Sequence, residues 1–209
     1  MDYRRPLLAV TPTLDGDVLA ALARADIELS GRELARHVRY GSTEGIRRAA
    51  DRLVAEGTVS RRPAGSAHLY RLNREHLAAP WIEGLAGLRE QLIERLRAHV
   101  AGWRQPASVA LLFGSVARSE ASAESDLDLF VVRPVSSDPD SEPWHDQLLE
   151  LQHSATAWTG NDARVLEYGE QELAALADAP LLDELLRDGI ELFGSRRTLR
   201  RLARAGLEG

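Results

Sequence analysis

The sequence predicts an α+β protein built in two parts. Three helical patterns followed by a two-strand pattern occupy residues 1–78, and a Gly-Ser step between apolar runs, followed by two aspartates, marks residues 79–209. The parts also differ in charge, since residues 1–80 hold 13 Arg against 10 Asp and Glu, a net of +3, whereas residues 81–209 hold 13 against 22, a net of −9. We therefore expect two domains. Only the first has the positive net charge that would favour binding to an anionic polymer.

The composition narrows the chemistry. With no cysteine there is no disulfide and no thiolate metal site, so any metal must be held by oxygen or imidazole. No segment near Met1 has the features of a signal peptide, and no apolar run approaches membrane-spanning length. We expect a cytoplasmic protein with no membrane partner. All 26 basic residues are arginine, so their number alone says little about function.

Three helices are expected in the first domain. Residues 15–25 place apolar side chains at helical spacing after two first-turn aspartates. Residues 30–38 begin with a serine N-cap and have a glutamate three residues later, which is the pattern of a capping box. Ser42 can cap the third helix, whose buried stripe runs until Gly57 ends it.

A β-hairpin is expected to follow these helices. Two short strand-like runs over residues 58–72 flank the turn 63–66, so Arg61 and Arg62 belong to the hairpin tip. Three helices followed by a hairpin define a winged helix-turn-helix. In that fold the third helix enters the major groove of double-stranded DNA and the wing lies along the backbone.

We expect the DNA contacts on the third helix and on the wing. Polar side chains face solvent opposite the buried stripe, and the helix start offers backbone N–H groups to a phosphate. Arginine reads guanine edges or holds phosphates. The candidates are Ser42, Thr43, Arg47, Arg48, Arg61 and Arg62. Two alternatives remain open, since these residues could be ordinary surface and winged helices also bind proteins.

Residues 28–77 resemble the ArsR-like winged-helix module. The matching stretches are SGRELARHV, IRRAADRLVAEGTVSRR and HLYRLNREH. Many transcription factors share this arrangement, so it identifies the fold far better than the DNA target.

A long connecting helix is expected over residues 81–103. Its apolar residues recur at helical intervals. The helix could be a spacer, or its apolar stripe could form the seam of a homodimer, which would suit a DNA binder that reads paired half-sites.

The stretch LLFGSVARSEASAESDLDLFVV, residues 111–132, combines a turn with a carboxylate pair. An apolar strand ends at Gly114-Ser115, one helical turn follows, and a second strand carries Asp126 and Asp128. Because side chains alternate along a strand, both carboxylates share one face. Like charges this close need a cation, a proton or an arginine between them, and hard oxygen ligands favour Mg²⁺ or Mn²⁺.

The turn itself suits a phosphate. Gly114 lets the backbone approach a ligand closely, and the amides from Ser115 onward can form an anion-binding concavity. Arg118 can reach a triphosphate from the same short helix. Metal and phosphate clamps of this kind stabilise charge at a reacting phosphorus, so the parts fit phosphoryl or nucleotidyl transfer, with Asp126 and Asp128 as the catalytic candidates.

The order and spacing of these parts carry a resemblance. Gly114-Ser115, ten residues, then Asp126-Leu127-Asp128, with apolar strands on both sides, resembles the polymerase-β-like nucleotidyltransferase superfamily, especially its minimal bacterial members. The resemblance spans about residues 83–195 and implies a small mixed sheet flanked by helices. It further implies that the two aspartates bind the metal and that the Gly-Ser step contacts the nucleotide phosphates.

The chain departs from that superfamily at one position. Active members usually place a third carboxylate on a later strand, expected here within residues 161–168, and counting from Gly160 the matching position holds Arg164. Asp162 shares the strand face of Arg164 and could substitute, whereas Glu167 points the other way. The departure threatens catalysis more than nucleotide binding, and an arginine there could pair with the aspartates and displace the metal.

The leading hypothesis is a DNA-binding protein whose second domain binds Mg-NTP, with ATP as the expected nucleotide, and transfers an NMP group to a protein or small-molecule hydroxyl. The resemblance suggests adenylylation of a HEPN-type toxin. The main alternative is a transcriptional regulator that has lost catalysis and senses a nucleotide or partner, which Arg164 supports. A pure interaction module is a third hypothesis.

The last expected helix is rich in arginine. Five arginines in residues 196–204 fit either nucleic-acid contact or the solvated face of a packed helix.

Overall fold

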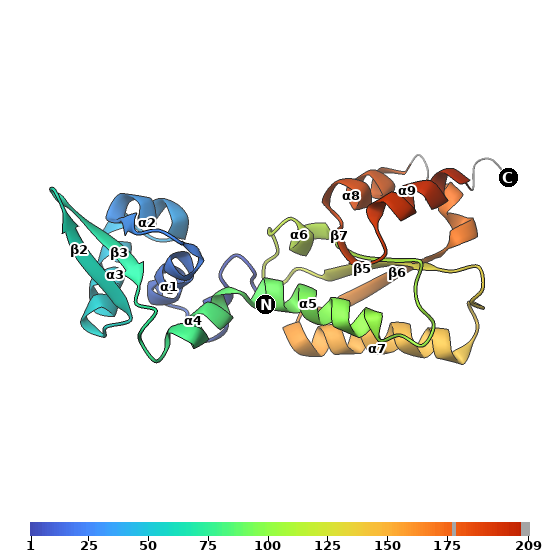
Figure 1. Cartoon of the computed structure of the whole chain (residues 1–209), viewed down its shortest axis with the longest axis horizontal. Helices are drawn as coiled ribbons and strands as arrows, with labels where there is room; N and C mark the ends of the chain where they lie inside the picture. The colour runs from blue at the N-terminus through green and yellow to red at the C-terminus, as the bar shows by residue number, and fades with distance from the viewer. Residues whose placement is uncertain (177–178, 206–209) are drawn as a thin grey trace. The chain divides into compact units, whose positions relative to one another are not determined.

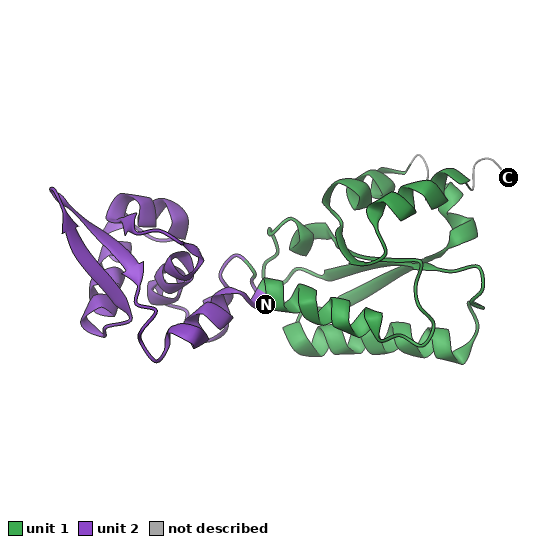
Figure 2. Cartoon of the chain, viewed as in Figure 1, with its two compact units in different colours: residues 1, 3, 89–209 green, residues 2, 4–88 purple. Residues whose placement is uncertain are grey.

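A computed structural model describes residues 1–176 and 179–205 of the chain. The chain divides into two compact units (Figure 2). The first unit along the chain, purple in Figure 2 and labelled unit 2 there, comprises Asp2 and residues 4–88. The second, green and labelled unit 1 there, comprises Met1, Tyr3 and residues 89–209.

The first unit follows the predicted order of helices and hairpin (Figure 1). The capping box predicted at Ser30 is present, with Ser30 N donating to Glu33 Oε2 at 2.8 Å and Glu33 N donating to Ser30 Oγ at 3.3 Å. The elements of this unit are η1 (Pro6–Ala9), α1 (Leu14–Arg24), β1 (Leu29–Ser30), α2 (Gly31–Val38), α3 (Thr43–Ala55), β2 (Val59–Ala64), β3 (Ala67–Leu72) and α4 (Ala79–Ala86).

The hairpin belongs to a three-stranded antiparallel sheet in the order β1-β3-β2. Strand β2 is an edge strand, which is why it accommodates Pro63, a residue that lacks a backbone donor. The strands continue to the pair Ala64 and Ala67, so the turn is Gly65-Ser66 and is tighter than the predicted one. Gly65 supplies the positive φ of 60° that such a turn requires.

A main hydrophobic core holds the first unit together, and a smaller cluster of Leu7, Ala20 and Ala86 lies between η1, α1 and α4. The stripes predicted on the helices are buried against the sheet and against α4. The core residues are Val18, Leu22, Leu29, Leu34, Val38, Ile46, Ala49, Ala50, Leu53, Val59, Tyr70, Leu72 and Ile82.

The second unit is a four-stranded mixed sheet covered by helices. Its elements are α5 (Leu88–Ala101), β4 (Val109–Phe113), α6 (Gly114–Ala117), β5 (Leu127–Arg133), α7 (Glu142–Thr159), β6 (Ala163–Gly169), η2 (Glu170–Leu176), α8 (Pro180–Asp188), β7 (Ile190–Phe193) and α9 (Arg196–Ala205). The strand order is β6-β5-β4-β7, in which β5 and β6 are parallel and the other two pairs are antiparallel. Among the helices of residues 1–176 and 179–205, none is long and apolar enough to cross a membrane.

The two central strands are buried on both faces, which explains why β4 and β5 read as nearly continuous apolar runs. Leu127 and Leu129 of β5 pack toward α5 and α7, whereas Phe130 and Val132 pack toward η2, α8 and α9. Figure 1 shows these two helical layers on opposite sides of the strands. The face of β5 that carries Asp128 is therefore the one that meets α8.

The predicted long connecting helix is wrong, because the helix is interrupted. Gly87 ends α4, and α5 begins at Leu88. The apolar stripe is divided between two cores: Ile82 is buried in the first unit, and Leu92 and Leu96 are buried in the second. These residues are therefore unavailable as the homodimer seam that the sequence suggested.

Candidate functional site

The Gly-Ser step and the carboxylate pair meet at one end of the sheet. Strand β4 ends at Phe113, which pairs with Asp128 in the antiparallel register, so Gly114 begins α6 directly beside Asp128. Gly114 has a φ of 71°, and a Cβ added to it would overlap Asp128 Oδ2. The backbone conformation therefore favours glycine, and any Cβ at this position would force the Asp128 carboxylate to move.

Asp128 is a half-buried carboxylate with a shifted protonation equilibrium. Burial raises its pKa above the ordinary value, and the nearby charge of Asp126 adds to the rise. Arg164 opposes the shift. A cation placed beside Asp126 and Asp128 would favour the ionised form of Asp128 against this burial.

Arg164 lies on β6, on the strand that the sequence predicted. It lies opposite Asp128 in the parallel register of β5 and β6, and its Nη1 is 2.7 Å from Asp126 Oδ2. Its Nε donates to Asp162 Oδ2 at 3.1 Å. The side chain of Arg164 is 63% exposed, and exposed ion pairs contribute only about 0–1 kcal/mol. A cation or a phosphate could therefore displace it at little cost.

Glu167 points away from this site, as its place in the alternation predicts. Its Oε1 accepts hydrogen bonds from Trp144 Nε1 and Arg133 Nε, both at 2.8 Å, on the side of the sheet covered by α7. Glu167 therefore does not supply the third carboxylate.

Glu184 is a site residue that the sequence reasoning missed. It lies on α8 and forms an ion pair with Arg118, and its charge contributes to the raised pKa of Asp128. Arg118 immediately follows α6 and also bonds Glu120 Oε2 at 3.0 Å. Arg118 is thus held by two acids and would have to leave them to reach a triphosphate.

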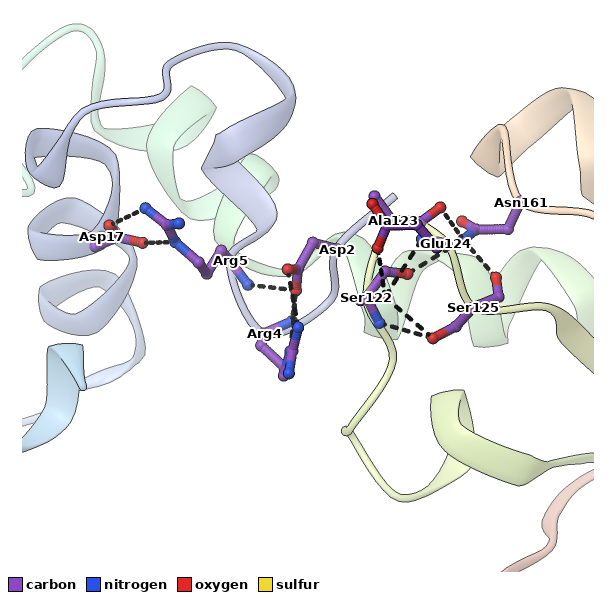
Figure 3. Close-up of polar contacts among 9 residues, drawn as sticks. All are labelled: Asp2, Arg4, Arg5, Asp17, Ser122, Ala123, Glu124, Ser125 and Asn161. Atoms are coloured by element: carbon purple, nitrogen blue, oxygen red, sulfur yellow. Dashed lines mark hydrogen bonds and ion pairs between the residues drawn. The ribbon is translucent and has the colours of Figure 1, made fainter. Parts of the chain in front are cut away.

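Asn161 is a second residue that the sequence did not reveal. Its side chain is 2% exposed, and its Nδ2 donates to the carbonyl oxygens of Ser122, Ala123 and Ser125 at 3.4, 3.3 and 2.8 Å (Figure 3). These carbonyls belong to the loop that leads into Asp126. Asn161 therefore fixes the approach to the carboxylate pair.

The carboxylate oxygens of this site suit a divalent cation whose remaining coordination positions are filled by a bound substrate. No cluster of three or more His, Cys, Asp or Glu suited to a metal occurs within residues 1–176 and 179–205. Asp126 and Asp128 supply two carboxylates on one face, and Mg²⁺ is commonly held by one or two carboxylates together with substrate phosphates and water. The two aspartates alone therefore form half of a site that an incoming triphosphate can complete.

The residues predicted to contact DNA lie on α3 and β2 of the first unit. Ser42 caps α3, and its Oγ accepts a hydrogen bond from Gly45 N at 3.1 Å. Thr43 is exposed in the first turn. Glu44 is the acceptor for both helix arginines, at 2.8 Å from Arg47 Nη2 and 3.0 Å from Arg48 Nε.

The guanidinium groups on this face are paired with acids. Arg47 and Arg48 lower the pKa of Glu44 to about 2, so this acid stays ionised even in mildly acidic solution. Asp51 joins α3 to the hairpin, since it bonds Arg47 and Arg61, each at 2.9 Å.

Arg62 likewise pairs with Glu28. The predicted DNA face therefore has less free positive charge than its arginines suggest.

A glycine turn set against two carboxylates on one sheet face is chemically suited to bind a cation and a phosphorylated ligand together. Residues 89–186 match the family model described as the nucleotidyltransferase domain, so the second unit contains a nucleotidyltransferase domain.

No curated protein matches the chain. Two solved structures that match it are a toxin-antitoxin with AMP-PNP, at 18% identity and a TM-score of 0.38, and the toxin-antitoxin MntA-HepT, at 14% identity and a TM-score of 0.36. Each likeness covers 57% of this chain and 84% of the other chain.

Proposed function

We propose that the second unit binds a nucleoside triphosphate, expected to be ATP, with Mg²⁺ or Mn²⁺ and transfers its NMP group to a hydroxyl. The observation that carries the proposal is the contact between Gly114 and Asp128 inside a nucleotidyltransferase domain. This contact sets the phosphate-binding turn and the cation-binding carboxylate side by side, which is what an in-line transfer requires.

Each residue of the site has a role in this transfer. The turn at Gly114 and Ser115 holds the phosphates, and Asp126 and Asp128 hold the cation. The cation, when bound, neutralises charge on the phosphates. Arg118 offers further positive charge once it leaves its acid partners.

The transfer forms one bond and breaks another. The acceptor hydroxyl oxygen bonds to the α-phosphorus. The bond between the α-phosphorus and the oxygen that bridges it to the β-phosphorus breaks, and pyrophosphate leaves with that electron pair. The hydroxyl proton passes to solvent, because β6 carries Arg164 where a third carboxylate would stand.

The acceptor in this proposal is a partner protein of the HEPN-toxin type. The motif resemblance suggests this partner. The test is to incubate the chain with Mg²⁺ and each α-labelled NTP, alone and with the protein encoded beside it. Label should enter the partner with the intact chain and with a control carrying Asp146→Asn and Glu150→Gln, two exposed acids on α7. It should be lost with Asp126→Asn and Asp128→Asn.

A second candidate is a regulator that binds a nucleotide without transferring it. The ion pair between Arg164 and Asp126 favours this candidate, because the guanidinium occupies an oxygen that a cation would need. Nucleotide binding without label transfer to any partner supports the sensor. Absence of nucleotide binding contradicts both candidates.

We further propose that the first unit is a winged helix-turn-helix that binds double-stranded DNA and regulates transcription. Support comes from the order of α1, α2, α3 and the β2–β3 hairpin, with α3 exposing Arg47 and Arg48 at its N-terminal half. Because their pairs with Glu44 are exposed, phosphates can replace the acid. Arg47→Ala with Arg48→Ala should weaken binding to the chain's own promoter region and reduce its salt dependence, and an unchanged salt slope would place the interface elsewhere.

A further inference from the structure

The last helix presents a cationic face that the proposed transfer does not use. Leu199 and Ala203 of α9 are buried against η2 and α8, which fixes the orientation of the helix. The opposite face carries four exposed arginines at positions i, i+3, i+4 and i+7, and their side chains line one open hollow: Arg197, Arg200, Arg201 and Arg204. Figure 1 shows α9 beside α8, on the side of the sheet away from α5 and α7.

This face differs from the arginine-bearing face of α3 in lacking acids. Helix α9 has no Asp or Glu, whereas α3 supplies Glu44 and Asp51 to its own arginines. Within residues 1–176 and 179–205, no ion pair involves any of the four α9 arginines. The acids of η2 are also engaged, since Glu170 accepts from Ser108 Oγ and Glu172 accepts from Gly169 N.

We propose that this face, the α9 arginine face, binds the phosphate backbone of double-stranded nucleic acid without reading its sequence. Its four arginines span about 10 Å along the helix axis, because each residue adds 1.5 Å. A duplex presents roughly six phosphate charges over that length. Four forked guanidinium groups at this spacing match such a charge density, and each can bond phosphate oxygens bidentately.

The chemistry of the face disfavours other partners. A protein interface needs an apolar centre, and a membrane-surface helix needs exposed apolar side chains beside the basic ones. Leu199 and Ala203 of α9 are buried in the core and Leu202 packs against it, so the exposed face has no large apolar side chain. Non-specific single-strand binding draws on aromatic stacking, and α9 has no aromatic residue. A duplex backbone needs only the charges that the face provides.

The test measures the affinity of the full chain for a generic 20-base-pair duplex as salt rises from 50 to 200 mM. Four phosphate contacts predict about a 150-fold loss of affinity over this range from the α9 arginine face, and two contacts predict about 12-fold. Arg200→Gln with Arg204→Gln should therefore lower the slope of log affinity against log salt by about 1.8. Arg200→Lys with Arg204→Lys, which keeps the charge, should retain most of the slope.

Two controls separate this face from other charges. Arg74→Gln with Arg97→Gln removes two charges that are paired with Glu83 and Glu94, and it should leave the slope unchanged. Arg47→Gln with Arg48→Gln tests the first unit separately.

The proposal is overturned if the wild-type slope persists in the Arg200/Arg204 variant, or if only the Arg47/Arg48 variant lowers it. Binding of the chain to polyglutamate, without any binding to the duplex, would also overturn the proposal and would favour an acidic protein partner. Because no nucleotide or acceptor enters this assay, its outcome is independent of the transfer reaction.

Discussion

Replacing Gly114 with alanine would place a methyl group against the carboxylate of Asp128. At a φ of 71° a non-glycine residue costs about 1–2 kcal/mol, and moving Asp128 out of its rotamer adds about 0.5–1.5 kcal/mol. Gly160 provides a matched control, because it has a φ of 73° and no atom lies within 4 Å of its added Cβ. Gly160→Ala therefore has the backbone cost without the overlap.

The two variants should differ in nucleotide binding more than in stability. Displacing a ligand carboxylate by about 1 Å is enough to lower activity about 100-fold, so we expect Gly114→Ala to weaken Mg-NTP binding at least about tenfold. Gly160→Ala should leave that binding within about twofold of the wild type. Isothermal titration calorimetry measures both affinities, and thermal melting verifies that both variants fold. Equal nucleotide affinities in two folded variants would refute the assignment of Gly114 to the site.

Three further predictions concern other parts of the molecule. Asn161→Ala leaves three loop carbonyls without their shared donor and should lower the free energy of unfolding by about 1–3 kcal/mol. The loss should appear as a lower melting temperature of the second unit, and an unchanged melting temperature would mean that other contacts hold the loop. Arg164→Asp removes the ion pair to Asp126 and restores a carboxylate, so Mg²⁺-dependent nucleotide affinity should rise; a fall would show that Arg164 itself binds the phosphates. Glu44→Gln frees Arg48 and leaves Arg47 paired with Asp51 alone, so it should steepen the salt slope of DNA binding by about 0.9 and by up to about 1.8 if phosphate also displaces Asp51. Glu56→Gln, which changes an exposed acid at the end of α3, should leave the slope unchanged, and equal slopes in the two variants would place the DNA interface away from α3.

Local patterns were sufficient to predict much of this fold. The capping box at Ser30 and the alternation that puts Asp126 and Asp128 on one face depend on neighbours in sequence, and the sequence revealed both. The pairs that Glu44 makes with Arg47 and Arg48 were not predicted, although their spacings of three and four residues place them on one helix face.

The remaining features depend on contacts between distant segments. Glu184 reaches the site only because α8 returns to the face of the sheet that carries Asp128, and Asn161 acts on a loop 36 to 39 residues earlier in the chain. The break at Gly87 was missed because the helical spacing continues through it, while the two segments join different cores.

The central claim is that Asp126 and Asp128 hold a cation on which nucleotide binding depends. The direct measurement is the affinity of the intact chain for ATP with and without Mg²⁺, repeated for Asp126→Asn with Asp128→Asn and for the Asp146→Asn and Glu150→Gln control. We predict Mg²⁺-dependent binding in the intact chain and the control, and its loss in the Asp126/Asp128 variant. Binding of the same affinity in all three proteins, or binding that ignores Mg²⁺, would contradict the assignment of this site.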